Sequence, residues 1–342
     1  MQHIAIDLGL RESQVCVRNQ QGEIVDEKRL ATTKLARYLD TQPPSRVIVE
    51  TSAEAFFVAD AARESGHQVR VVAATLVRAL GVGERGIKTD QRDARKLSEV
   101  SSRVDLPSVH VPSQLSRDRK ALCNSRQVLV DVRTKLINHV RGYLRRQAIV
   151  VPARSSKFTS HVRNKLLQQP AGLPAHIESV LSSIEQMDQA LKAADDQLIS
   201  IAEQDPLCQR LMTVPGVGPV ISIRFIAAID EIGRFASAHH VMSYLGLTPG
   251  ENSSSLRKQR TAITKAGASD LRFSLVQGAW SALRSRRGDP MLLWARKLAE
   301  RRNRQVAAVA LARKLAGILF ALWRDNTTYD PSRGSTARSE HS

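Results

Sequence analysis

Apolar and polar residues alternate, or apolar residues gather in short runs, over the first 75 residues. The runs HIAIDLG (3–9), RVIVE (46–50) and QVRVVA (68–73) predict strands, and SQVCVRNQQGEIVDEKRL predicts a hairpin that turns near Gln21. Between RVIVE and QVRVVA, the segment AEAFFVADAARESG has the apolar spacing of a helix. Antiparallel strands followed by a β-α-β unit predict a mixed sheet with helices, which is an α/β fold.

Two long segments in the middle of the chain have helical apolar spacing. Residues 113–147 and 174–204 carry apolar side chains at intervals of three, four and seven residues. This spacing predicts two long helices, which pair either within one chain or between chains as a coiled coil. Asp205 and Pro206 end the second helix.

The remaining sequence completes a division into four segments. An α/β domain covers 1–110, a long-helix segment covers 111–205, and a mainly α-helical domain covers 206–326. This last domain begins at LMTVPGVGP and ends in two helical stretches that reach about residue 324. Residues 327–342 are polar and poor in apolar side chains, which predicts a disordered tail.

Charge narrows the class of partner. The chain has 51 Lys and Arg against 33 Asp and Glu, a formal net charge of +18, and this surplus favours nucleic acid over other partners. An anionic membrane is the alternative, but we find no apolar run that reaches the roughly 20 residues that a span needs, and no signal peptide. We therefore expect a cytoplasmic protein without a membrane partner. Cys16, Cys123 and Cys208 are odd in number and far apart, which predicts buried free thiols.

Four acidic residues are candidates for a metal site. Asp7 and Glu50 each follow an apolar run, while Asp90 and Asp93 are three residues apart, on one face of a predicted helix. Strand-end polar residues and surface ion pairs are the ordinary explanation. If the acids converge, their oxygens are ligands that Mg²⁺ prefers, and two ions about 4 Å apart can act on a phosphodiester.

Two further motifs point to phosphate. Gly216 and Gly218 in VPGVGP lie between helical segments, as in a helix-hairpin-helix turn whose N–H groups bind a DNA phosphate; a glycine-rich tight turn is the alternative. The stretch ENSSSLRKQRTAITKAG (251–267) predicts a polar loop with three serines, and a flexible serine-rich loop is its ordinary meaning. The candidate nucleic-acid contacts are Gly216, Gly218, Arg257, Lys258, Arg260 and Lys265. From Arg257 to Arg304 there are thirteen Lys and Arg but three Asp and Glu, which predicts a phosphate-contacting surface.

In their order along the chain, these blocks resemble the DEDD-type insertion-sequence transposases, the family of Piv-like DNA invertases and bridge-RNA-guided recombinases. Four acids match those of its N-terminal domain: Asp7 in AIDLG, Glu50 in VIVETSA, and Asp90 and Asp93 in KTDQRDARKL. LMTVPGVGP, SYLGLTPGENSSS, ITKAG and LRFSLVQGAW match its C-terminal domain, so the resemblance covers nearly the whole chain.

The resemblance implies the fold and the chemistry. It implies a RuvC/RNase H-like N-terminal domain, a coiled-coil segment for dimerisation, and a C-terminal domain with a serine nucleophile. It further implies Mg²⁺, double-stranded donor and target DNA, a structured guide RNA, and a homo-oligomer that is a dimer, or a tetramer in the synaptic complex. The acids and the serine of one composite site would come from different protomers.

When the sequence is matched to the family's motif through ITKAG, the family's nucleophile falls at Ser254, and Ser253 is the neighbouring alternative. Where the family often has glycine after the serine pair, this chain has Ser255, so a shift of the nucleophile to Ser255 stays open. The function implied is that of a site-specific DNA recombinase of a mobile element, with a covalent phosphoserine intermediate.

Three other functions compete with this interpretation. A RuvC-like nuclease or Holliday-junction resolvase would use water in place of serine. An actin-like sugar kinase shares the AIDLG pattern, but we find neither its second Asp-x-Gly loop nor its Gly-Gly adenosine motif. A nucleic-acid-binding protein without catalysis would need only the positive charge.

Overall fold

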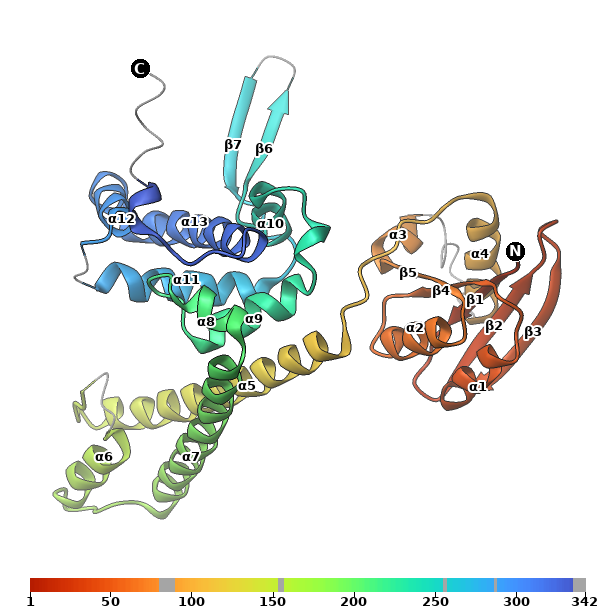
Figure 1. Ribbon diagram of the computed structural model, residues 1–342. Coiled ribbons are helices and arrows are strands. Elements are labelled where there is room, and N and C mark those ends of the chain that lie inside the picture. The colour runs from red at the N-terminus through yellow and green to blue at the C-terminus, as the bar shows by residue number, and fades with distance from the viewer. Residues whose placement is uncertain (80–89, 153–156, 255–256, 286–287, 335–342) are drawn as a thin grey trace. The chain divides into compact units, whose positions relative to one another are not determined.

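The computed structural model describes residues 1–79, 90–152, 157–254, 257–285 and 288–334 (Figure 1). The side chain of Asp90 and those of residues 252–260 lie outside this description. The chain divides into two compact units, Met1–Val111 and Pro112–Ser342.

The N-terminal unit is built on a five-stranded mixed sheet, as the alternation of apolar residues predicts. The strands lie in the order β3-β2-β1-β4-β5, in which β1 is antiparallel to β2 and parallel to β4, and β4 is parallel to β5. Their bounds are β1 His3–Asp7, β2 Glu12–Arg18, β3 Ile24–Ala31, β4 Arg46–Glu50 and β5 Gln68–Val72. The predicted hairpin is confirmed, because β2 and β3 pair antiparallel.

Helices cover both faces of this sheet. One face packs, through residues such as Ile4 and Val49, on α1 (Leu35–Asp40) and α2 (Ala55–Glu64). Alternate residues point the other way, so Ala5 and Ile48 pack with Leu97 of α4 (Asp90–Arg103) on the opposite face. The short helices α1 and α3 (Ala74–Ala79) were not predicted.

The second unit begins with the two predicted long helices, α5 (Gln114–Arg146) and α7 (Ala175–Gln204). They pair antiparallel within one chain, and ion pairs such as Arg126–Asp195 (2.5 Å) and Arg133–Asp188 link them. The short helix α6 (Phe158–Leu167) packs with the C-terminal part of α5 and the N-terminal part of α7 around a small apolar cluster.

The C-terminal region of this unit is mostly helical, as expected. Its helices are α8 Pro206–Met212, α9 Pro219–Ile229, α10 Ala238–Tyr244, α11 Ser269–Arg284, α12 Pro290–Arg301 and α13 Arg304–Arg324. The two helical stretches predicted at its end are three helices, because Asp289 caps the start of α12 and Asn303 caps α13. A hairpin of β6 (Pro249–Ser254) and β7 (Arg257–Ile263) projects from the helices (Figure 1).

Three sequence expectations are resolved by the packing. The three cysteines are free and buried, as predicted. Helix α13 is long and apolar enough to cross a membrane, contrary to our reading of the sequence, but side chains such as Leu315 and Phe320 lie in the core of the second unit. The predicted disorder does not extend to residues 329–334, because Tyr329 donates its hydroxyl to Asp289 and Pro331–Gly334 form a 3-10 helix. Residues 335–342 lie outside the described residues.

Candidate active site

Asp7 and Glu50 end neighbouring parallel strands at the same edge of the sheet. The register pairs Ile6 of β1 with Val49 of β4, so Asp7 and Glu50 stand one step further along. Asp7 shares its face with Ala5, and Glu50 shares its face with Ile48, which is the face that α4 covers. Both acids are half-buried. The sheet therefore brings together two acids that lie 43 positions apart in the sequence.

Helix α4 runs antiparallel to β1, and this direction brings its first turn to the edge where Asp7 lies. Near the helix end, Ser101 Oγ is 2.9 Å from Nδ1 of His3, the first residue of β1. One turn earlier, Ser98 Oγ is 3.3 Å from Sγ of Cys16, which pairs with Ala5. Continuing at 1.5 Å per residue, the start of α4 approaches the level of Asp7.

The start of α4 carries the other two predicted acids. Ala94 is fully buried against the sheet, and its neighbour Asp93 is half-buried. Asp93 and Glu50 form no hydrogen bond or ion pair with another residue of the described chain. By contrast, Glu99 of the same helix pairs with Lys96 and Arg103, as an ordinary surface acid does. The side chain of Asp90 is among those not described.

A second interaction holds α4 on the sheet. The Arg95 guanidinium donates to both carboxylate oxygens of Glu27 on β3, each at 2.5 Å. These bonds lower the pKa of Glu27. The ion pair links α4 to β3 two residues after Asp93.

The donor set at this edge suits a hard cation, because carboxylate oxygens are the ligands that Mg²⁺ prefers. Among the described side chains, the oxygens of Asp7, Glu50 and Asp93 do not all lie within 4.8 Å of one another. The three residues thus share one edge and one face of the sheet without forming a closed cluster.

The two glycines of VPGVGP have different surroundings. Gly216 has a positive φ of 89°, and a Cβ placed on it would lie 2.6 Å from the Gly278 carbonyl oxygen and 2.8 Å from Ala282 Cβ on α11. Gly218 caps the start of α9 and has open space where a Cβ would stand. Close packing on α11 accounts for Gly216, whereas packing does not require a glycine at 218.

The serine segment is a β-hairpin, which corrects the predicted polar loop. Ser254 pairs with Arg257, and Ser253 pairs with Lys258, so the serines end β6 at the far end of the hairpin from the helices. The expected side-chain contacts of Arg257, Lys258 and Arg260 with nucleic acid, and the position of Ser255, fall outside the described residues.

The hairpin root is held by tight backbone contacts. The N–H of Lys265 donates to the Gly246 carbonyl, and Lys265 itself is exposed with a φ of 56°. Cβ atoms on Gly246 and Gly267 would lie 2.3 Å and 2.0 Å from backbone oxygens. No larger residue fits at either glycine without movement of the chain.

One positioning residue escaped the sequence analysis. Arg272 of α11 donates from Nη1 to the carbonyl oxygens of Leu245 (2.9 Å) and Ala266 (3.0 Å). These carbonyls lie on the two chain segments that enter and leave the hairpin. Arg272 therefore ties both sides of the hairpin root to one helix.

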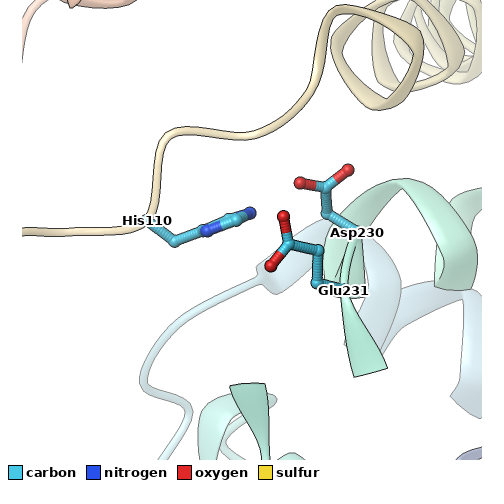
Figure 2. Close-up of side chains that lie close together, drawn as sticks. All are labelled: His110, Asp230 and Glu231. Atoms are coloured by element: carbon cyan, nitrogen blue, oxygen red, sulfur yellow. The ribbon is translucent and has the colours of Figure 1, made fainter. Parts of the chain in front are cut away.

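Asp230, an acidic residue of the second unit, has a structural role. Asp230 ends α9 with a φ of 61°, and its carboxylate accepts hydrogen bonds from the N–H (3.0 Å) and hydroxyl (2.6 Å) of Ser113, which caps α5. Figure 2 shows Asp230 beside Glu231; His110, also labelled there, is part of the N-terminal unit. Asp230 thus joins the end of one helix to the start of another.

Two family models match separate stretches of the chain. The family model described as "Transposase IS116/IS110/IS902 family" matches residues 208–293, and a DEDD model described as "Transposase" matches residues 4–148. The "Transposase for insertion sequence element IS1111A" of Coxiella burnetii is 31% identical over 248 residues, which are 71% of this chain and 68% of the relative.

Two other relatives match over almost their whole length. The "Probable family 20 transposase" of Pseudomonas aeruginosa is 29% identical over 338 residues, 97% of this chain and 99% of that protein. The "Transposase for insertion sequence element IS1328" of Yersinia enterocolitica is 26% identical over 335 residues, 95% of this chain and 98% of that protein.

Proposed function

The chain belongs to the IS116/IS110/IS902 family of transposases, and we propose that it is a site-specific recombinase that works through a covalent phosphoserine intermediate. That it is an enzyme of transposition follows from the family. The serine chemistry, the Mg²⁺ and the guide RNA are parts of the proposal. The observation that supports it most is the placement of Asp7, Glu50 and the start of α4 at one edge of the N-terminal sheet.

We further propose that the N-terminal unit is RuvC/RNase H-like. Three antiparallel strands followed by two parallel ones, in the order β3-β2-β1-β4-β5, are consistent with this fold. Asp7, Glu50, Asp90 and Asp93 would hold Mg²⁺ there, and when bound the ion would offset negative charge that develops on the phosphate. The half-buried position of three of these acids would limit their movement as DNA enters.

The serine step transfers a phosphoryl group without consuming ATP. The Ser254 oxygen attacks phosphorus and forms a new P–O bond, while the bond from phosphorus to the leaving sugar oxygen breaks. The serine gives up its proton, and the departing oxygen takes up a proton to become a hydroxyl. The reverse step, with the hydroxyl of another strand as nucleophile, joins the exchanged strands and frees the serine.

The proposed partners follow from charge and from the exposed helices. With a net charge of +18, the chain would bind double-stranded donor and target DNA and a structured guide RNA in the cytoplasm. In α5, Val128 is 59% exposed and Val132 is 38% exposed, one turn apart. This apolar face would pair with a second copy as a coiled coil in the dimer, and two dimers would form the synaptic tetramer with composite sites.

Trapping of the intermediate tests the proposal. Protein incubated with end-labelled substrate DNA, Mg²⁺ and the cognate RNA should yield a protein–DNA adduct that survives a denaturing gel. A RuvC-like nuclease or junction resolvase, in which water attacks, would cut the DNA and leave no adduct.

A further inference from the structure

A large apolar pocket lies at the root of the serine hairpin. Its volume is about 780 Å³, within the range of about 300–1,000 Å³ that is usual for small-ligand pockets. Pro249 and Ile263, at the two ends of the hairpin nearest the helices, form one side. Trp294 of α12 and Val309 of α13 contribute to the other walls.

Two cations line this pocket without an acid to balance them. Arg313 and Lys314 of α13 are both half-buried, and no aspartate or glutamate is among the described lining residues. Neither cation forms an ion pair within the described parts of the chain. Arg313 donates from Nε to the sulfur of Met242 at 3.5 Å, and Lys314 Nζ lies 4.8 Å from the centre of the Trp294 ring. A half-buried charge with such weak partners is stabilised when an anion binds.

We propose that this pocket holds one unstacked nucleotide of a DNA strand, with its base against the apolar wall and Trp294 and its phosphate at Arg313 and Lys314. A nucleotide has two parts that suit this pocket: a planar base whose π face can stack on Trp294, and a negatively charged phosphate that can pair with Arg313 and Lys314. Stacking on an aromatic side chain tolerates any base, because every base has a π face. The pocket therefore binds without sequence preference.

The pocket serves a position that flanks the reacting phosphate. Ser254 lies five residues beyond Pro249 in β6, which is about 17 Å along an extended strand. At 3.4 Å per base step along a DNA strand, this separation corresponds to roughly five steps. A nucleotide held at the root would thus fix the strand on one side of the cleavage point while the hairpin end reaches the phosphate.

Tryptophan fluorescence of the full chain tests the proposal. Single-stranded (dT)12 should quench the emission of wild-type protein, and Trp294→Phe should remove most of this quenching. Trp294→Ala, which removes the ring, should weaken binding about ten-fold. Trp280→Phe is the matched control, because Trp280 is also half-buried and lines a separate pocket, in which Glu300 lies together with Arg284, Arg296 and Arg304. Quenching that persists in Trp294→Phe, or that Trp280→Phe removes equally, would overturn the proposal.

Salt dependence tests the phosphate contact. Lys314→Gln should lower the slope of log K against log salt by about 0.7, the value for one phosphate contact on a single strand. An unchanged slope contradicts the contact. A pocket that instead binds a second copy of the chain would show itself if Trp294→Ala altered self-association in sedimentation and left the affinity for (dT)12 unchanged, and this too would overturn the proposal.

The inference rests on the chain being a DNA-acting transposase and not on the serine chemistry. The titration is therefore repeated with Ser254→Ala protein, which should quench like wild type. If wild-type protein forms no covalent adduct but Trp294 is still quenched, the serine proposal fails and the nucleotide pocket stands.

Discussion

Asp7 and Glu50 occupy equivalent positions at the ends of two adjacent parallel strands, one step beyond the Ile6–Val49 pair. Because side chains alternate along a strand, both acids point to the face that α4 covers. The antiparallel course of α4 brings Asp93 toward the same edge.

Substitution of the α4 acids separates binding from chemistry. Asp93→Asn keeps the shape of the side chain and removes its charge, so strand cleavage should fall by about 100-fold or more while DNA affinity changes little. Glu99→Gln, which makes the same charge change on the same helix but outside the proposed site, should cleave at the wild-type rate. A cleavage assay and a filter-binding assay measure the two effects. Wild-type cleavage by Asp93→Asn would contradict the metal site.

Removal of Arg272 should loosen the hairpin root. Arg272→Met loses two charge-assisted hydrogen bonds, which should destabilise the root by about 1–3 kcal/mol. Hydrogen exchange of the amides at 246–265 should then quicken, and adduct formation should slow. Arg272→Lys should restore part of the rate, since an ammonium can still reach one carbonyl. Arg284→Met removes an exposed arginine from the same helix and serves as the control for hydrogen exchange. Equal quickening of exchange in both variants would show that the two hydrogen bonds of Arg272 do not hold the hairpin root.

The two glycines of the α8–α9 turn should respond differently to alanine. Gly216→Ala forces a Cβ against α11 at a positive φ, so we expect a loss of stability of about 1–3 kcal/mol in thermal unfolding. A Cβ at position 218 meets open space, so Gly218→Ala should lower the free energy of unfolding by only about 0.5 kcal/mol, through the less favourable helix cap. If the turn binds phosphate, Gly218→Ala should still weaken DNA binding. Unchanged affinity in that variant would leave the turn with a structural role alone.

Local patterns in the sequence sufficed for the strands and for the long helices. The apolar run in RVIVE reflects a strand that is buried on both faces, and the helical spacing of 113–147 reflects one buried face; both elements appear almost at the expected bounds. The serine hairpin was missed for the converse reason: it projects from the helices, so residues 251–260 carry no alternation of apolar side chains.

Tertiary features left no trace in the sequence. The partners of Arg272 are backbone carbonyls 27 and 6 residues away, and any residue type supplies a carbonyl. The pocket beside Trp294 depends on how α10, α12, α13 and the hairpin pack. No one of the four acids could be identified from the sequence by itself; only their combination pointed to a site. The pairing of β1 with β4 explains why Asp7 and Glu50 lie at the same edge of the sheet.

Mixing of variants tests whether the acids and the serine belong to different subunits. Ser254→Ala and Asp93→Asn proteins should each be inactive alone. If the site is composite, a mixed oligomer contains some sites with intact acids and an intact serine, so a mixture should regain a measurable fraction of recombination. A mixture of Ser254→Ala with a Ser254→Ala, Asp93→Asn double variant is the control, because it contains no intact serine. No recovery above this control would place both groups in one subunit.

The serine scan tests the central claim most directly. End-labelled DNA, Mg²⁺ and the cognate RNA are incubated with wild-type protein and with Ser253→Ala, Ser254→Ala and Ser255→Ala, and adducts are resolved on a denaturing gel. We predict that Ser254→Ala abolishes the covalent adduct, while the other two variants only slow its formation. Loss of the adduct in Ser253→Ala or Ser255→Ala alone would move the nucleophile by one position. An adduct of wild-type yield in all three variants would contradict serine catalysis.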